Sequence, residues 1–372
     1  MAIEEAIIQL ARKKQGEEKV ILSLEQKGFC GTLLKDGTTT ENEAREVKDF
    51  IDLVNSGSVS WIDYIVDDLK TDAPSIAATL GFSEQLVCTL LKVDKSGYED
   101  QDKELGVLLP AMIVRGFEVK IGYILILMRN NVVVTIHTSE VQRFFRLRRY
   151  AKIFLRKIKP GLSIQDKLTH VLIRIVDENN GKNFDHLREI EENADTVSEK
   201  LSNVNTPREE IGHDIHMMKH ALIVYLTGLW ETVDVLNALR YGDPELLTDD
   251  PKLLQRISGL VVEVNNQIGL AEHMSEVLAS GLEVMQSIYN NQLQILNNKL
   301  ALLVAYLTVL GTAFLVPNTI ATALGSSAFQ LGPDDRIWYT ALLVGSMVVA
   351  TVGSYIWVKK MGLLPEKPDG HA

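Results

Sequence analysis

Cysteine is nearly absent from the chain, and so are the short motifs that mark most enzyme classes. Cys30 and Cys88 are the only cysteines in 372 residues, which argues against thiolate metal motifs and a disulfide framework. The sequence contains no phosphate-cradling glycine loop, no activated-nucleophile motif and no HExxH. We therefore expect a protein that is not an enzyme, needs no cofactor and does not pump with ATP.

A signal peptide is also missing, and so is an excess of positive charge. The N-terminal sequence MAIEEAIIQLARKKQGEEK has no apolar core of the kind that directs secretion. The net charge of −11 argues against a nucleic-acid partner and mildly favours cationic ones. We expect the large polar part of the chain to stay on the cytoplasmic side.

One segment is strongly basic, in contrast to the acidic composition of the whole chain. Residues 139–159 read SEVQRFFRLRRYAKIFLRKIK, in which bases are interleaved with aromatic residues. The pattern fits nucleic-acid binding, a role near anionic lipid or an ion path, or an amphipathic helix. We favour the helix, which would bury Phe144, Phe145, Ile153 and Leu155 while its bases are solvated or paired.

Charged residues are missing from two long stretches near the C-terminus, residues 300–324 and 337–358. A bilayer core of about 30 Å needs roughly 20 apolar residues in a helix. We predict that both stretches are transmembrane helices rather than two buried helices of a soluble protein. The sequence leaves open whether the first helix ends at Val316 or continues to Leu324.

The flanking charges predict the orientation of this hairpin. Lys299 precedes the first span, and Lys359 and Lys360 follow the second, so the positive-inside rule places both chain ends in the cytoplasm. Residues 325–336 would then form an outer loop and residues 359–372 a cytoplasmic tail. We expect a multi-pass protein of the cell membrane, plasma or inner, with the lipid bilayer as its partner.

Residues 1–160 are predicted to form a cytoplasmic α/β domain. Five segments are rich in β-branched and aromatic residues, as strands are: 18–26, 58–66, 111–119, 121–129 and 132–138. Residues 71–82 and 83–93 resemble two short helices, and the charged residues 97–106 a loop. Arg129-Asn130-Asn131 separates the last two strands, as a hairpin turn would.

Residues 161–250 are predicted to form a helical hairpin region. An acidic helix at 183–203, with Phe184 in its apolar stripe, would pair with a helix that runs to Tyr241. Thr206-Pro207-Arg208-Glu209 has the pattern of a capped start for the second helix. Three histidines on its face could share a transition metal, although solvent-facing histidines are the favoured interpretation: His213, His216 and His220.

Residues 251–299 are predicted to form a long stalk helix. Its apolar residues recur at steps of three and four, and no proline interrupts it before Pro317. A single helix has nothing to bury this stripe against, so we predict an oligomer whose stalks bundle round an axis. The stripe consists of Ile257, Val261, Val264, Ile268, Ala271, Met274, Leu278, Leu282, Met285, Tyr289, Leu293 and Leu296.

A polar stripe follows one face of the same helix into the first apolar span. Polar groups should not face lipid, so in a symmetric bundle the stripe would line the axis. Amides and hydroxyls without fixed charge suit an ion that keeps much of its water, as Mg²⁺ does. Alternatively, the hydroxyls bond to their own helix or hold helices together. The predicted pore-lining residues are Asn290, Gln294, Asn297, Thr308, Thr312, Thr319, Thr322 and Ser326.

Several short segments of the chain form a recognisable set: Trp61-Ile62-Asp63, the segment VVVTIHT, Asp243-Pro244-Glu245-Leu246-Leu247, Asn297-Asn298-Lys299, Pro317-Asn318-Thr319 and the lysines after the second apolar span. Together they resemble the CorA family of divalent-cation channels. The resemblance implies a homopentamer with a funnel-shaped cytoplasmic body, a stalk and two C-terminal membrane helices, the first of which lines the pore. The fold expected is therefore an α+β membrane protein.

The chain departs from the family at its signature. Relatives carry Gly-Met-Asn at the outer end of the first membrane helix, whereas this chain has no Gly-Met-Asn. The residues that could form its selectivity region are Asn318, Gly325, Ser326 and Ser327. Asp334 and Asp335 could concentrate cations at the outer mouth. Regulatory metal ligands stay unknown, with Asp67, Asp68, Asp249 and Asp250 as candidates by charge alone.

Two functions follow from these expectations. The first is a pentameric channel that passes divalent cations passively, most of all Mg²⁺ and in a broader version Co²⁺, Ni²⁺ or Zn²⁺. The second is a scaffold of the same build that has lost transport and acts as a membrane partner or regulator. The polar stripe separates them, because only the first function requires it.

Overall fold

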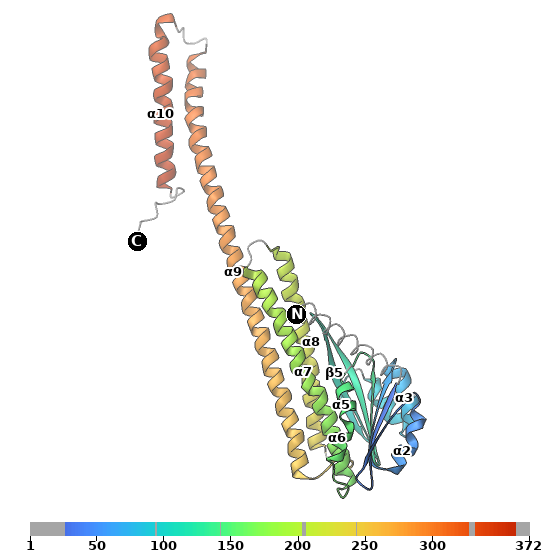
Figure 1. Ribbon diagram of the computed structural model, residues 1–372. Helices are drawn as coiled ribbons and strands as arrows, with labels where there is room; N and C mark the ends of the chain where they lie inside the picture. The colour runs from blue at the N-terminus through green and yellow to red at the C-terminus, as the bar shows by residue number, and fades with distance from the viewer. Residues whose placement is uncertain are drawn as a thin grey trace, which may run out of the picture. The chain divides into compact units, whose positions relative to one another are not determined.

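The structure is a computed structural model, and it divides into two compact units between Leu282 and Glu283. It describes residues 27–361 except for 94, 142, 203–205, 243 and 327–331. The predicted strand at 18–26, most of the predicted tail, Asp243 and Ser327 therefore lie outside the described residues. The first unit is a sheet with helices on both faces, and the second contains the last part of α9 together with α10 (Figure 1).

The sheet of the first unit has seven described strands in the order β2-β1-β3-β7-β6-β5-β4. Neighbouring strands are antiparallel except for β3 and β7, which run parallel. The strands are β1 (Gly28–Leu34), β2 (Thr39–Ala44), β3 (Gly57–Val66), β4 (Gly97–Asp100), β5 (Glu104–Arg115), β6 (Glu118–Arg129) and β7 (Val132–Thr138). Because β3, β5, β6 and β7 are covered on both faces, they are made almost wholly of apolar residues.

Predicted strands 58–66, 121–129 and 132–138 are confirmed, and so is the turn between the last two, where Asn130 has φ +49°. The predicted strand 111–119 is wrong at its centre. Gly116, with φ +62°, turns the chain there, so its two halves belong to β5 and β6 and pair with each other. The charged residues 97–106 are not a loop throughout, since they begin with β4 and end inside β5.

One face of the sheet is covered by short helices from the first part of the chain. These are η1 (Val47–Phe50), α2 (Ile51–Ser56), α3 (Leu69–Thr79) and α4 (Glu84–Lys92), which confirm both predicted helices of that region. Their core contains Phe50, Leu86 and Leu90, packed on apolar residues of β3, β6 and β7. Gly106 of β5 lies directly under α4, because a Cβ atom there would collide with Leu90.

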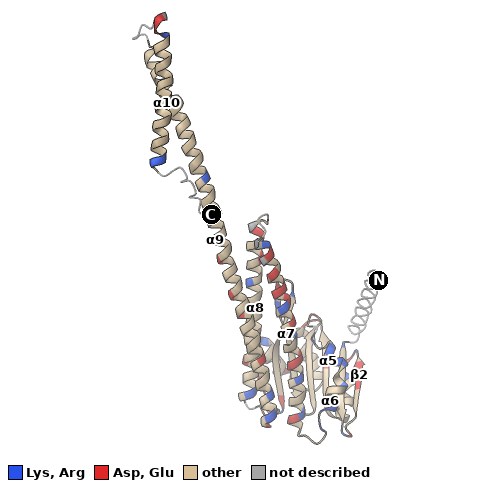
Figure 2. Ribbon diagram, turned by 60° about the vertical axis from the view of Figure 1, so that its left-hand side comes forward, with Lys and Arg blue, Asp and Glu red and all other residues tan. Residues whose placement is uncertain are grey.

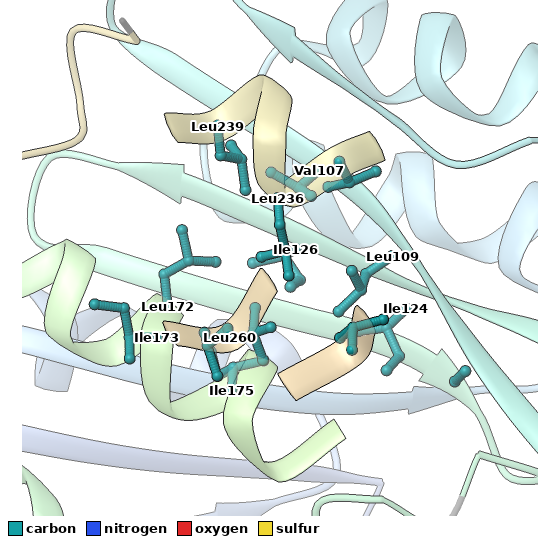
Figure 3. Packing of buried hydrophobic residues seen from close by; sticks show 14 of the residues in the cluster. Val107, Leu109, Ile124, Ile126, Leu172, Ile173, Ile175, Leu236, Leu239 and Leu260 are labelled. Atoms are coloured by element: carbon teal, nitrogen blue, oxygen red, sulfur yellow. The ribbon is translucent and has the colours of Figure 1, made fainter. Parts of the chain in front are cut away.

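Two short and three long helices cover the other face. The short ones are α5 (Phe145–Arg149) and α6 (Ala151–Arg156), and the long ones are α7 (Ile164–Ser202), α8 (Arg208–Tyr241) and the start of α9 (Pro251–Leu324). Figure 3 shows their contact with the sheet, where Ile124 and Ile126 of β6 lie among leucines and isoleucines of the three long helices. α8 approaches closely at Gly228, where a Cβ atom would stand 2.7 Å from the sulfur of Met112.

The predicted helical hairpin region differs from the structure in three details. The predicted acidic helix at 183–203 belongs to the second half of one longer helix, α7, and Phe184 of its apolar stripe is exposed. α8 begins at Arg208 with Pro207 in the cap position and no side-chain hydrogen bond to the cap, so the predicted threonine cap is not formed. His213, His216 and His220 are all exposed, as the favoured interpretation expected.

The basic segment 139–159 forms α5 and α6 rather than one amphipathic helix. Phe144 and Leu155 are buried as predicted, whereas Phe145 is half-buried and Ile153 is exposed. Its paired bases include Arg146, whose Nε donates to Glu178 at 2.8 Å, and Lys152, whose Nζ lies 3.3 Å from a carboxylate oxygen of Glu41.

Two arginines of this segment, Arg143 and Arg148, are buried, and Arg148 is paired, which is one of the two alternatives predicted for the bases. The guanidinium of Arg148 reaches Asp63 of β3, and its Nε donates to Oδ2 at 2.6 Å. Thr135 of β7 donates to Oδ1 of the same carboxylate at 2.6 Å, and His137 Nε2 lies 3.2 Å from it. The charge of Arg148 lowers the pKa of the fully buried Asp63 carboxyl against the opposing effect of burial. The network joins α5 to the two parallel strands.

Candidate functional site

The predicted stripe lies on α9, which is continuous from Pro251 to Leu324 and includes Pro317. The question left open by the sequence is therefore answered, since the apolar segment remains helical to Leu324 rather than ending at Val316. Gly325 follows the helix, and its N–H donates to the carbonyl of Ala321 at 2.8 Å. α10 (Arg336–Lys360) is the second apolar helix.

Three described helices are long and apolar enough to cross a membrane, α8, α9 and α10. The most apolar window of α8 is 56% buried within the chain, because α8 packs on the sheet. The corresponding windows of α9 and α10 are only 11% and 6% buried. Figure 2, which colours the ribbon by residue type, shows the neighbouring parts of these two helices almost free of charged residues, apart from their ends. Exposed apolar helices of this length are compatible with insertion into a bilayer.

The apolar stripe predicted for the stalk has two halves with different surroundings. From Ile257 to Leu278 it is buried against the core of its own chain, so this half has a partner without any second subunit. Tyr289, Leu293 and Leu296 are exposed. The statement that a single stalk has nothing to bury its stripe against is therefore wrong for the first half, because α7 and α8 provide the missing surface.

The members of the polar stripe share one face of α9. At about 100° per residue their directions fall within a sector of roughly 80°. Seven of the eight predicted pore-lining residues are exposed in the single chain, and Thr312 is half-buried. Asn318 is exposed but points away from this sector, and Ser326 lies just beyond the end of the helix. Polar groups on an exposed apolar helix mark a surface that does not belong against lipid.

The hydroxyl groups of the stripe donate hydrogen bonds back to their own helix. The bonds run from Thr308 to Val304, from Thr312 to Thr308, from Thr319 to Leu315, from Thr322 to Asn318 and from Ser326 to Ala323, at 2.7–2.8 Å. The alternative that predicted this bonding is correct on that point. The same bonding occurs on α10, as from Thr340 to the carbonyl of Arg336, so it does not single out the stripe.

This bonding determines whether the hydroxyl groups act as hydrogen-bond donors or acceptors on the outer side of the helix. Each hydroxyl has one proton and two lone pairs, and the proton is directed at the backbone. The oxygen therefore presents lone pairs on the outer side of the helix. Water bound to a cation directs its own lone pairs at the metal and its protons outward, so it needs hydrogen-bond acceptors. The amide oxygens of Asn290, Gln294 and Asn297 are acceptors of the same kind.

Small residues are buried on α9 and α10, which run side by side near their apolar ends (Figures 1 and 2). Ala305 and Ala313 of α9 are almost fully buried, as is Val358 of α10. Ser346, Ala350 and Ser354 form a half-buried row on α10 at steps of four. Small side chains allow membrane helices to approach closely. Ala305 and the half-buried Thr312 lie at the border of the stripe, so the contact leaves the rest of the stripe uncovered.

The acidic residues before α10 are partly engaged in local structure. Asp335 Oδ1 accepts from Trp338 Nε1 at 2.7 Å, and Oδ2 accepts from the N–H of Gly332 at 2.8 Å. This aspartate therefore fixes the turn η2 (Pro333–Asp335) at the start of α10. Asp334 is exposed. Of the two charges predicted for an outer mouth, only that of Asp335 accepts hydrogen bonds among the residues that the structure describes.

Two of the four aspartates considered as regulatory ligands cap helices. Asp68 accepts from the backbone N–H groups of Lys70 and Thr71 at the start of α3, and Asp250 accepts from that of Lys252 at the start of α9. Among the residues that the structure describes, no three histidine, cysteine or acidic side chains are grouped to hold a metal ion.

Comparisons with known proteins give a consistent picture. A family model described as CorA-like Mg²⁺ transporter protein matches residues 56–360. The complete CorA magnesium transporter from Methanocaldococcus jannaschii superposes with a TM-score of 0.66 at 18% identity, over 91% of this chain and 98% of that one. The full-length CmaX protein gives 0.60 at 14% identity, over 90% and 98%. The cytoplasmic domain of ZntB from Vibrio parahaemolyticus gives 0.53 at 14%, over 71% and 98%. At these identities the structural likeness concerns the fold. A search of curated protein sequences finds no match.

Proposed function

This chain belongs to the CorA-like Mg²⁺ transporter family, a family of divalent-cation transporters and not of enzymes, and we propose that it acts as a homopentameric channel for Mg²⁺. Co²⁺, Ni²⁺ or Zn²⁺ would pass through the same channel only as hydrated ions. α9 and α10 would cross the cell membrane, with both chain ends in the cytoplasm and the α/β body and stalks forming a funnel.

One observation supports the proposal most directly, the polar stripe on an otherwise apolar and exposed helix. An uncharged path of amide and hydroxyl oxygens suits a cation that retains its water, because acceptors bind the outer side of the hydration shell. Selection would then depend on hydration rather than on direct ligands. The selectivity region would include Asn318, Gly325, Ser326 and Ser327, in place of the Gly-Met-Asn that the chain lacks.

Self-association is supported by the exposed side of α9. Apolar residues recur there at intervals of seven, as at Leu270, Val277 and Val284 and again at Ile288 and Ile295, and all are exposed in the single chain. A seven-residue repeat is typical of helices that pack along their length. The face opposite to the body's core therefore offers a surface for neighbouring stalks.

Flux through such a path needs no energy source other than the membrane potential. The potential contributes about 2.3 kcal/mol per elementary charge per 100 mV, and thus roughly twice that for a divalent cation. Entry into a cell with a negative interior would be favoured. Exposed Asp334 at the outer end would raise the local cation concentration.

The experiment is divalent-cation uptake into liposomes that contain the purified protein. We compare the wild type with Thr319→Leu/Ser326→Leu, and use Thr340→Leu as the matched control. Thr340 makes the same intrahelical bond on α10, outside the stripe. We expect Mg²⁺ uptake by the wild type and the control, and its loss in the double variant.

The other outcomes are equally informative. If Thr319→Leu/Ser326→Leu still takes up Mg²⁺, the protein is a channel, but the stripe does not line its pore. Absence of uptake for every divalent cation, from a folded oligomer, favours the alternative, a CorA-like scaffold that no longer transports and acts as a partner or regulator.

A further inference from the structure

A polar cavity lies in the first unit, away from the stripe. Its volume is about 290 Å³, and it opens between the end of β5, the segment after β7 and the middle of α7. The polar residues that line it are Arg115, Glu140, Arg143, Lys182 and His186. Four of these five side chains are bases, in a chain whose net charge is −11. Basic side chains clustered around one cavity create a local positive potential that attracts anions, even in an acidic protein.

Arg143 is the most unusual of these residues, because it is buried without an ion-pair partner among the described residues, and Asp185 acts on its charge only from beyond ion-pair distance. Arg143 is 4% exposed, and its guanidinium donates to two neutral carbonyl oxygens, of Asn179 at 2.9 Å and of Met112 at 2.5 Å. Within the described part of the chain, no carboxylate oxygen lies within 4.0 Å of it. Burial lowers the pKa of Arg143 to about 10, so the group is still charged at neutral pH. Buried charges are ordinarily paired.

Lys182 and His186 stand one turn apart on α7, beside Arg143. Lys182 Nζ lies 3.4 Å from Asp185, in an exposed and loose pair that leaves the ammonium free to turn into the cavity. The Nδ1 atom of His186 is buried and has no hydrogen-bond partner among the described residues. Burial, together with the nearby charges of Arg143 and Lys182, lowers the pKa of His186 to about 4. The imidazole is therefore neutral, in a positive potential.

The remaining charges do not cancel this potential. Glu140 lies 4.0 Å from Arg115, and both are exposed, so they compensate each other near the surface. The volume is roughly ten times the 30 Å³ that one water molecule takes up in the liquid. It is at the lower end of the range for small-molecule pockets. The cavity therefore has room for a tetrahedral oxyanion and a small attached group.

We propose that this cavity is an anion-binding site for a phosphate-type oxyanion, free or as the terminal group of a small water-soluble molecule. Arg143 and Lys182 supply the charged donors, and Nδ1–H of His186 supplies a neutral one. The anion completes the charge balance of Arg143 and joins β5 to α7. The site is independent of whether α9 conducts cations, since no residue of the stripe takes part.

The test measures binding of inorganic phosphate to the full-length protein in a phosphate-free detergent. Binding is monitored by the broadening of the ³¹P resonance at neutral pH and about 0.15 M salt. We expect saturable binding with a dissociation constant of about 1 mM or below. Lys182→Ala should weaken it about tenfold, because a charge-assisted hydrogen bond is lost. Arg188→Ala removes one positive charge from an exposed position of α7 outside the cavity, and should change binding less than about twofold.

Two further probes separate the sources of the phosphate group. Glycerol 3-phosphate should compete with inorganic phosphate, and a short-chain phosphatidic acid should compete no better. The proposal is overturned if no broadening occurs at about ten times the expected dissociation constant. It is also overturned if Arg188→Ala weakens binding as much as Lys182→Ala, which would mean general surface attraction, or if only the acyl-bearing lipid binds.

Discussion

The buried carboxylate of Asp63 provides the sharpest test of the energetics of the α/β body. Asp63→Ala removes the acceptor of two hydrogen bonds of 2.6 Å, from Arg148 and Thr135. Arg148, which is 8% exposed, would be left charged and buried without a carboxylate, with only the backbone carbonyl of residue 63 to accept a hydrogen bond from it. Removal of one member of a buried ion pair costs about 3–5 kcal/mol, more than the loss of either hydrogen bond alone. We expect a local loss of stability of this size.

Hydrogen–deuterium exchange of the full-length protein measures this loss where it occurs. A decrease of about 3 kcal/mol in the free energy of opening raises the exchange rate of protected amides more than about 100-fold. The effect should be confined to β3, β7 and α5, which the network joins. Asp67→Ala is the control, because this aspartate is exposed and pairs with Lys27 only at the surface. Its effect should be below about 1 kcal/mol.

A double-mutant cycle separates the free-energy cost of leaving one charge buried and unpaired from the cost of the lost packing. Asp63→Asn and Arg148→Met should each destabilise the strands, whereas the double variant should be less destabilised than the sum of the two, by about 2 kcal/mol or more. The reasoning is refuted if Asp63→Ala exchanges no faster than Asp67→Ala, or if the cycle is additive.

Two other predictions concern close packing and pH. Gly106→Ala should cost about 1–3 kcal/mol in thermal or chemical unfolding, because its Cβ would collide with Leu90, whereas Gly97→Ala, which meets nothing within 4 Å, should be nearly neutral. His186 has a folded pKa of about 4, below its unfolded value of about 6.5, so the unfolded chain takes up a proton between these values and stability falls as the pH falls through this window. His186→Gln should remove that part of the pH dependence of the melting temperature in phosphate-free buffer; equal pH dependence in both proteins would contradict it.

Much of the fold could be predicted where consecutive residues of one element already show, as a continuous apolar run, that the element is buried. The strands at 58–66, 121–129 and 132–138 are nearly continuous apolar runs, because helices cover them on both faces. The uncharged segments before and after residue 330 are helical as predicted. Length and composition were sufficient there, since an apolar run of that size has few alternatives.

β1 and β2 were missed for a physical reason. β1 reads GFCGTLL, whose two glycines resemble a turn, and it becomes a strand only through pairing on both edges. β2 reads TTENEA and is an edge strand, so it needs no apolar face. The hairpin at Gly116 was missed because apolar residues continue on both sides of the turn.

The buried arginines could not be recognised from the sequence either. Arg148 and its partner Asp63 are 85 residues apart, and Arg143 bonds to carbonyl groups that carry no sequence signal at all. The polar stripe, by contrast, was visible as a periodic pattern, because all its members belong to one helix. Its exposure and the direction of its hydroxyl protons required the structure.

The continuity of α9 has a consequence for insertions and deletions. Each residue of an α-helix turns the chain by about 100°. A single residue added between Leu282 and Asn290 would therefore rotate the polar stripe by that angle relative to the apolar stripe that packs on α7 and α8. Seven added residues would restore the phase to within about 20°. Selection can therefore act on the number of residues between the two stripes, even where it does not constrain which amino acids those residues are.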